Sequence, residues 1–222
     1  VSQATWSQPE NRPSRSAESI LAKRLESGEF KPSRDELFEL ARHADPYVAH
    51  AARRVLADET HSWTPDEITR LTPTDRLQAL LAIKPGTRID PDTAETACEC
   101  WVPLFLSDTD EHVQFEALRW IAEARLTEHL PAVEDIFARS DVSFKLFEAA
   151  IATWNALSGH PELGVRNTPK LLERVRDTSS SPQIRAYALR LLPNEWVGLD
   201  DVNSEESDRK DGLTIELMRK LL

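Results

Sequence analysis

Glycine, cysteine and long apolar runs are all in short supply in this chain. Its 222 residues include only 6 glycines and 2 cysteines. Six glycines cannot form a phosphate-cradling loop as well as the turns, and no Walker, GxGxxG or GxSxG motif occurs. Two cysteines do not make a disulfide framework. No apolar run approaches the ~20 residues needed to cross a bilayer, and no signal-peptide pattern is present, so we expect no membrane insertion.

Basic residues are too few to balance the acidic ones. The formal net charge is −11 and the isoelectric point is about 5.1. Because nucleic-acid phosphates would be repelled by this charge, we expect no nucleic-acid partner. The composition is 40% hydrophobic and 29% charged, which is typical of a globular protein rather than a disordered chain.

Apolar residues recur at steps of three and four through most of the chain, which is the period of amphipathic helices. The clearest case is segment 110–138, where a short break at 125–127 separates two apolar stripes. The stripe residues are Val113, Ala117, Trp120, Ile121, Ala124, Leu130, Val133, Ile136 and Phe137. We interpret the segment as an αα-hairpin that needs further copies to bury both of its faces. Alternation with period two is absent, so strands are not expected.

Capping signals mark where the helices start and end. Ser33 with Glu36 indicates a capping box, and Asp45-Pro46 combines an acidic cap with proline at the first helical position. Gly28 suits a helix C-terminus. Together with the periodicity, these signals predict helices at about residues 17–28, 33–43, 45–56, 64–71, 74–83, 90–107, 110–124, 130–138, 141–157, 167–177, 182–192 and 213–222.

Several of these helices are copies of one another. The segments DPYVAHAARRVL (45–56), DEHVQFEALRWI (110–121) and SPQIRAYALRLL (181–192) share a cap, an aliphatic residue three positions on and a small residue four beyond that. Residues 74–83 and 141–151 are looser copies, so the spacing is about 30–40 residues, the range of helical solenoids. We predict an all-α fold, an αα-superhelix of HEAT/armadillo type with about five helix pairs plus a terminal helix. It would form one domain over residues 17–222, after an extended arm at residues 1–16.

The repeated pattern resembles the HEAT repeat. In that family the helix with the valine is the second of each pair and lines the concave side. The resemblance implies a candidate binding strip on the sides of these helices away from the apolar stripe, where arginines gather in an otherwise acidic protein. An ordinary solvated face, paired with neighbouring carboxylates, is the alternative. The strip consists of Tyr47, His50, Arg53, Arg54, Gln114, Arg119, Lys145, Glu148 and Arg185.

A closer resemblance covers roughly residues 17–222. The segments ELARHADPYVAHAARRVL, DEHVQFEALRWIAEARLTEHLPAVE and RAYALRLLP…LTIELMRKLL are similar to the HEAT segment of large bacterial PVC-type proteins. Those proteins combine a dehydrogenase-like β-propeller, a HEAT array and a haem domain with CxxCH. This chain contains neither a propeller nor a CxxCH, so the resemblance implies a connector or docking role, in an extracytoplasmic or periplasmic location, and no redox chemistry.

Candidate chemical sites are weak, and we predict no catalytic residue, cofactor or metal. Cys98 and Cys100 would point to different sides of one helix, whereas a zinc pair needs both on the same side. The acidic run at 200–211 lacks the residue order of an EF-hand, so we interpret it as a solvated loop. Calcium binding is the alternative. Trp120 and Trp154 fall on apolar stripes and are predicted to be core, while an aromatic ligand box is the alternative for the six tryptophans.

The sequence therefore predicts a non-catalytic HEAT-repeat interaction or scaffold module, a connector within a larger protein. The alternatives are a free-standing adaptor that binds a protein or peptide in its groove and, more remotely, a HEAT-like lyase or DNA glycosylase. The last predicted helix, residues 213–222, lacks a second helix and ends on two leucines. We therefore expect a segment cut from a longer chain, with possible self-association through this helix.

Overall fold

The computed structural model describes residues 16–86 and 100–193 of the chain, and the fold in these ranges is entirely helical. No strand occurs among the described residues, which confirms the prediction of an all-α fold. The contacts divide the chain into two compact units, residues 1–90 and 91–222, and each is described by itself. Within the described ranges no helix combines the length and apolarity needed to cross a membrane.

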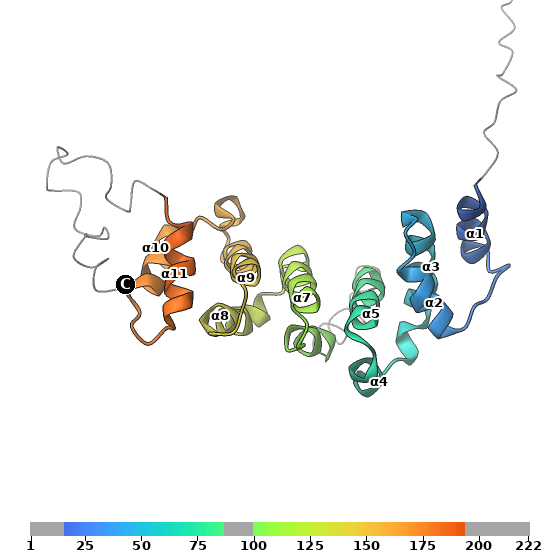
Figure 1. The fold of residues 1–222 in the computed structure, drawn as a ribbon, viewed down its shortest axis with the longest axis horizontal. Coiled ribbons are helices and arrows are strands. Elements are labelled where there is room, and N and C mark those ends of the chain that lie inside the picture. The colour runs from blue at the N-terminus through green and yellow to red at the C-terminus, as the bar shows by residue number, and fades with distance from the viewer. Residues whose placement is uncertain (1–15, 87–99, 194–222) are drawn as a thin grey trace, which may run out of the picture. The chain divides into compact units, whose positions relative to one another are not determined.

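The helices lie close to the predicted positions. In the first unit they are α1 (Ala17–Glu26), α2 (Arg34–Ala41), α3 (Pro46–Glu59), η1 (Thr60–Ser62), α4 (Pro65–Arg70) and α5 (Pro73–Gly86). In the second unit, residues 100–106 are helical. They are followed by α7 (Glu111–Ala124), η2 (Thr127–His129), α8 (Leu130–Ala138), α9 (Phe144–Leu157), η3 (Pro161–Leu163), α10 (Thr168–Arg176) and α11 (Pro182–Leu191) (Figure 1).

The helix caps predicted from the sequence are present in the structure. Ser33 and Glu36 form the reciprocal capping box at the start of α2, and Thr64 with Glu67 forms a second one at α4. The Asp45 carboxylate accepts hydrogen bonds from the backbone N–H groups of the first turn of α3. Gly28 has a φ of +72°, the left-handed conformation that glycine adopts beyond a helix C-terminus. Local sequence therefore sets most of the helix boundaries.

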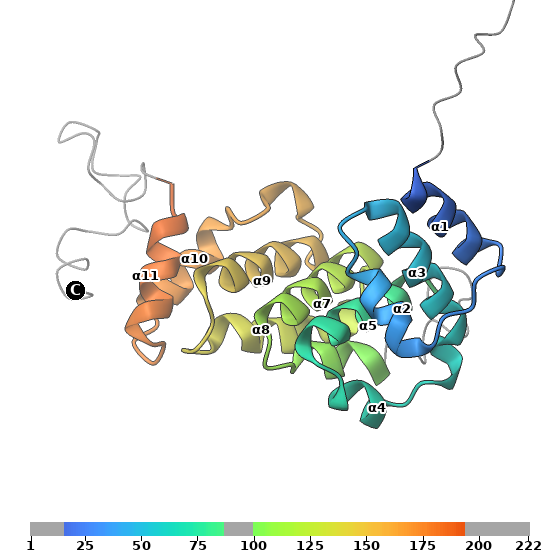
Figure 2. The same ribbon diagram turned by 45° about the vertical axis from the view of Figure 1, so that its right-hand side comes forward.

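In the first unit, α3 is the central helix. It pairs with α2, and it packs side by side with α1 on one flank and α5 on the other (Figures 1 and 2). Leu37, Ala52 and Leu56 are fully buried in this unit. Removing each leucine from water stabilises the fold by roughly 1.5–3 kcal/mol before entropy is counted. The second helix of the α2–α3 pair thus packs on α5, an arrangement compatible with an α-solenoid.

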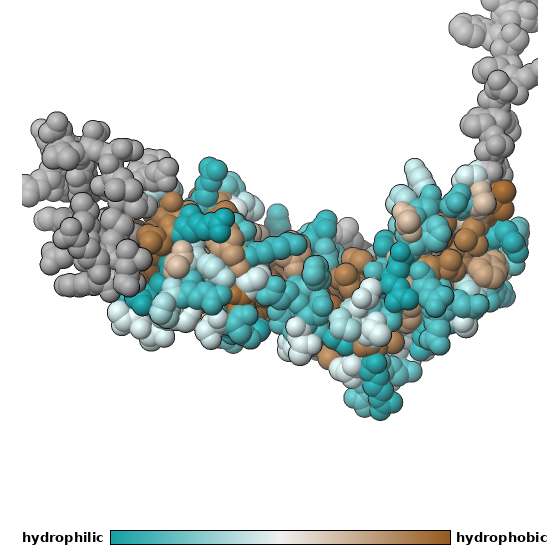
Figure 3. Space-filling view, viewed as in Figure 1, coloured by the Kyte–Doolittle hydropathy of each residue, from teal (hydrophilic) through white to brown (hydrophobic). Residues whose placement is uncertain are grey.

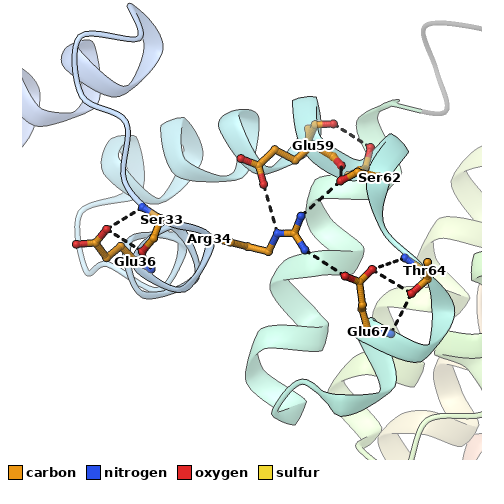
Figure 4. A network of polar contacts seen from close by, with 9 residues as sticks. Ser33, Arg34, Glu36, Glu59, Ser62, Thr64 and Glu67 are labelled. Atoms are coloured by element: carbon orange, nitrogen blue, oxygen red, sulfur yellow. Dashed lines mark hydrogen bonds and ion pairs between the residues drawn. The ribbon is translucent and has the colours of Figure 1, made fainter.

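A polar network ties the pairs of this unit together (Figure 4). Arg34, at the start of α2, donates to Glu59 at 3.4 Å and to Ser62 at 3.4 Å, and it forms an ion pair with Glu67 at 3.7 Å. Its guanidinium also lies over the buried ring of Trp63, 5.7 Å from the centroid. One side chain therefore connects α2 with the end of α3 and with α4.

The second unit corrects the expected hairpin at 110–138. In the structure α8 pairs with α9 and α10 pairs with α11, and α7 packs on α9. Glu111 of α7 accepts a hydrogen bond from the Ser143 N–H at the start of α9, at 2.8 Å. The hairpin prediction was wrong because a stripe shows which face of a helix is apolar but not which neighbour covers it.

Trp154 is less buried than predicted, and Ile20 is the most exposed large aliphatic side chain of α1. Trp120 is core, with 1% of its surface exposed, but Trp154 is half-buried and its Nε1 donates to Glu134 at 3.0 Å. Ile20 of α1 is 47% exposed, because α1 packs on α3 through the side that carries Ala22 and Leu25. The expected features at residues 1–15, Cys98, the acidic run 200–211 and the terminal helix 213–222 lie outside the described residues.

Candidate functional site

A cleft of about 420 Å³ lies between α1 and α3 in the first unit. Two of its lining residues, Tyr47 and His50, belong to the predicted strip. The cleft is lined by Ser16, Ser19, Ala22, Lys23, Glu26, Asp45, Tyr47 and His50. Its volume falls within the range of about 300–1,000 Å³ that is usual for ligand sites in proteins.

Helix periodicity explains how the walls are built. On α3, Tyr47, His50 and Arg54 are separated by three and four residues, so they share one face of the helix. On α1, the lining residues follow the same spacing from the Ser16 cap to Glu26 at the last turn. Since the two helices lie side by side (Figure 2), these faces form the walls of one groove.

The cleft carries exposed apolar surface. Tyr47 is 75% exposed and Ile20 is 47% exposed, and these are the large hydrophobic side chains that the described ranges leave uncovered. Ile20 is next to Ser16 and Lys23 on the surface of α1, because residues three and four apart are neighbours on a helix. The space-filling view shows hydrophobic surface over this part of the first unit (Figure 3). Of these two side chains, Tyr47 lines the cleft and Ile20 is not among its lining residues.

The cleft is lined by charged side chains of both signs. The Asp45 carboxylate is occupied by the N–H groups of Tyr47 and Val48, at 2.9 and 3.1 Å. No ion pair joins Lys23 or Arg54 to another residue of the described ranges. Glu26 is the other carboxylate that lines the cleft. The charged side chains that line the cleft are therefore Lys23, Glu26 and Asp45, and the His50 imidazole lies among them.

Arg53, the neighbour of Arg54, has an internal role in the structure. Its Nε donates to Gln78 of α5 at 2.8 Å, and its second nitrogen donates to the backbone carbonyl of Ala41 at 3.2 Å. Burial lowers the pKa of the Arg53 guanidinium. Arg53 thus holds the end of α2 and the side of α5 on α3, and it is not displayed in the way that Arg54 is.

The predicted strip residues of the second unit are held in different ways. Gln114 is 3% exposed and donates to the Asp108 carbonyl at 2.6 Å, which is a structural contact. Arg119 is exposed, but Glu123 and Glu116 of the same helix pair with it and raise the pKa of its guanidinium. Lys145 is exposed and lies over the Phe115 ring, 4.8 Å from the centroid. These three side chains already have partners within the unit.

Glu148 and Arg185 complete the strip and are both half-buried. The Nε of Arg185 is buried without a hydrogen-bond partner in the described structure. The cavity lined in part by Glu111 and Lys145 has a volume of only about 30 Å³, the space of a water molecule. This cavity is far smaller than the cleft between α1 and α3.

Metal-ligating side chains do not gather in the described ranges, where no group of three or more His, Cys, Asp or Glu could hold an ion. Cys100 is exposed and is not bonded to another cysteine. Sequence reasoning missed the α1 wall of the cleft, since it predicted a helix there but named no binding residue on it. The polar residues Ser16, Ser19, Lys23 and Glu26 recur at helical spacing and could have indicated a second exposed face.

Comparisons with protein-family models, with curated proteins and with solved structures found no match to this chain.

Proposed function

We propose that this chain is a non-catalytic interaction module, an α-solenoid of HEAT type that binds another protein segment in the cleft between α1 and α3. The observation that carries the proposal is the exposure of Tyr47 inside that cleft. A tyrosine at 75% exposure, beside a groove of about 420 Å³, has apolar surface that a partner can cover. Tyrosine is also among the residues that contribute most to protein interfaces.

The solenoid part of the proposal is supported by the way in which the helices pack. Pairs α2–α3 and α8–α9 recur, and second helices stack side by side at α3–α5 and at α7–α9. Within each unit, two such helices lie next to each other, and repeat proteins build binding surfaces from neighbouring helices of this kind. Following the resemblance of its repeats, the module would act as a connector that docks neighbouring domains or a peptide partner.

Selection from a random peptide library tests the proposal and assumes nothing about the identity of the partner. A library of peptides displayed on phage is selected on the immobilised full chain. We expect enriched sequences that bind the wild type and lose binding to Tyr47→Ala, because the aromatic contact in the cleft is gone. Arg119→Ala is the matched control, since it changes an exposed side chain of α7 outside the cleft.

Two outcomes would contradict the proposal. Enrichment that Tyr47→Ala leaves intact would show that peptides bind elsewhere on the chain. The absence of any enriched sequence after several rounds, with a correctly folded helical target, would show that the cleft does not bind peptides.

A further inference from the structure

We propose that the cleft between α1 and α3 recognises a basic segment of another protein, with an arginine or lysine side chain over the Tyr47 ring and beside the Asp45 and Glu26 carboxylates. This inference rests on the proposed function and names the class of its partner. The charges that line the cleft, the uncovered ring of Tyr47 and the total charge of the chain each support it.

The charged groups that line the cleft are acidic in sum. The lining contains the carboxylates of Glu26 and Asp45 and one cation, the ammonium group of Lys23, so the formal charge is −1 with histidine counted as neutral. Arg24, the next cation on α1, lies over the Phe30 ring at 5.8 Å and is not part of the lining. A cationic side chain is therefore attracted in this cleft, whereas an anionic one is repelled.

The Asp45 carboxylate has one oxygen left for a partner. Its Oδ1 accepts the N–H groups of Tyr47 and Val48, at 2.9 and 3.1 Å, and so caps α3. Its Oδ2 makes no hydrogen bond or ion pair with any residue that the structure describes. Accepting hydrogen bonds does not remove the negative charge of a carboxylate. Oδ2 can therefore accept a charge-assisted hydrogen bond from a guanidinium or ammonium group.

Tyr47 presents an aromatic face that the described part of the chain leaves uncovered. Elsewhere, lysine or arginine side chains lie 4.2–5.8 Å from ring centroids, at Phe30, Trp63, Phe115, Phe137, Phe144 and Trp154. Tyr47 is 75% exposed, and no cation of the described ranges lies over its ring. Because the negative face of an aromatic ring attracts a cation within about 6 Å, a partner's arginine or lysine can bind there in the same way.

The length of the groove suits a short extended segment. The lining residues of α1 run from Ser16 to Glu26, a rise of about 15 Å at 1.5 Å per residue. An extended chain covers that length with about four or five residues. A short linear segment can therefore place one cation on the ring while its neighbours follow the α1 wall.

The charge of the whole chain also favours a basic partner. Residues 1–90 contain 13 Lys and Arg and 14 Asp and Glu, a net charge of −1, which leaves −10 for residues 91–222. Neither part repels a cationic segment, and the total raises the concentration of basic partners near the chain. The total thus selects the sign of the partner, while the cleft selects where the partner is held.

Fluorescence anisotropy with three matched peptides tests the inference on the full chain. The peptides are short and carry a fluorescein label, with a central Leu-Arg-Arg, Leu-Gln-Gln or Leu-Glu-Glu among glycines and serines. We expect the arginine peptide to bind about three- to tenfold more tightly than the glutamine peptide, because exposed ion pairs and cation–π contacts are individually weak. Its binding should weaken as the salt concentration rises.

Removal of single charges identifies the groups responsible. Asp45→Asn and Glu26→Gln should each weaken binding of the arginine peptide about two- to fivefold, and Lys23→Gln should strengthen it by a similar factor. Asparagine caps a helix about as well as aspartate, so Asp45→Asn keeps the start of α3 folded. The matched control is Asp66→Asn, the same charge change at an exposed residue of α4, which should leave binding unchanged. Circular dichroism should show all four variants folded.

Two substitutions of Tyr47 separate the cation–π contact from a purely apolar one. Tyr47→Phe keeps an aromatic face and should bind the arginine peptide within about twofold of the wild type. Tyr47→Leu keeps apolar surface without a ring and should bind it about two- to fivefold more weakly. The site is exposed, so both variants should fold. Equal binding by the two variants would overturn the contact between the ring and the cation.

Each contrary outcome has a distinct meaning. Equal or tighter binding of the glutamine or glutamate peptide would overturn the basic partner but leave a peptide-binding module intact. An effect of Asp66→Asn as large as that of Asp45→Asn would also overturn it, since the total charge rather than the cleft would then be sensed. If the chain dimerises in sedimentation and Tyr47→Ala dissociates the dimer, a second copy fills the cleft and the inference fails. If no peptide binds and the library yields no sequence, the inference and the proposed function both fail.

Discussion

At the scale of single residues, neighbouring side chains of the same type have unlike roles. Arg53 and Arg54 are adjacent on α3, but helix geometry turns them about 100° apart. Arg53 is half-buried and donates hydrogen bonds to Gln78 and to the Ala41 carbonyl, while Arg54 is exposed. Composition and periodicity do not distinguish them. The direction of each side chain decides which arginine stabilises the fold and which is available to a partner.

The first prediction compares these two arginines. Arg53→Ala should lower the free energy of unfolding by about 1–3 kcal/mol, because it leaves the buried Gln78 amide without its partner. Arg54→Ala should change it by less than about 0.5 kcal/mol, as is usual for exposed sites. Urea unfolding followed by circular dichroism measures both. Similar losses in the two variants would contradict this assignment.

The second prediction concerns the two tryptophans. Trp120 is 1% exposed in the core, so Trp120→Ala should cost about 3–5 kcal/mol. Trp154 is half-buried and keeps one hydrogen bond, to Glu134, so Trp154→Ala should cost less, about 1–3 kcal/mol. The same urea titrations give both values, and a larger loss for Trp154→Ala would reverse the order that we expect.

The third prediction is a dependence of stability on pH. Hydrogen bonds from the Ser179 and Ser180 side chains and from the Ser179 N–H lower the pKa of Asp177 from 3.8 to about 2. Since the folded pKa is below the unfolded one, the stabilisation is complete above the unfolded pKa and is lost as the pH falls toward about 2. Asp177→Asn should therefore be destabilising at about pH 6 and progressively less so, relative to wild type, between about pH 4 and about pH 2. A constant difference in unfolding free energy across this range would exclude the linkage.

At the scale of helices, the caps can be recognised from the local sequence, whereas the packing partners cannot. Asp110 caps α7 by accepting from the N–H groups of His112 and Val113, at 2.9 and 3.3 Å, and this motif is visible in the sequence. That α7 lies against α9, and that α8 is the partner of α9, is not visible in it. A cap involves residues two or three apart, whereas packing joins residues far apart in the chain.

The fourth prediction tests such a cap. Asp110→Ala should cost about 0.5–2 kcal/mol, because two backbone N–H groups at the start of α7 lose their acceptor. Asp110→Asn is the matched control and should retain most of the stability, since asparagine caps helices about as well. Thermal unfolding of the two variants makes the comparison. Equal losses would mean that the negative charge, and not the hydrogen bonds, stabilises this end of the helix.

At the scale of the whole molecule, charge is distributed unevenly between the two units. The net charge is −1 for residues 1–90 and −10 for residues 91–222. A basic partner is thus attracted at long range mainly by residues 91–222, whereas an anionic partner is repelled. The summed charge governs which class of partner can approach, whereas the individual side chains of the cleft govern which segment is held.

The fifth prediction follows from the total of −11. The full chain should not shift a short duplex or single-stranded DNA in electrophoresis at low salt, because it has few cations to replace the counterions of the phosphates. A retarded band that disappears at higher salt would show a basic surface strong enough to overcome the net charge.

The sequence by itself determined the helical class, most helix boundaries and much of the core. Caps and the 3.6-residue period involve neighbours in the chain, so Ser33, Asp45 and the stripe through Val113 and Ile121 could be recognised without coordinates. It also indicated Tyr47 and His50 as candidates for binding. Only the tertiary structure decided that α1 supplies the second wall of their cleft, that Arg53 and Gln114 are held inside, and that α7 stacks on α9. Those features depend on which faces of distant helices meet, and a periodic pattern contains no information about the identity of the neighbour.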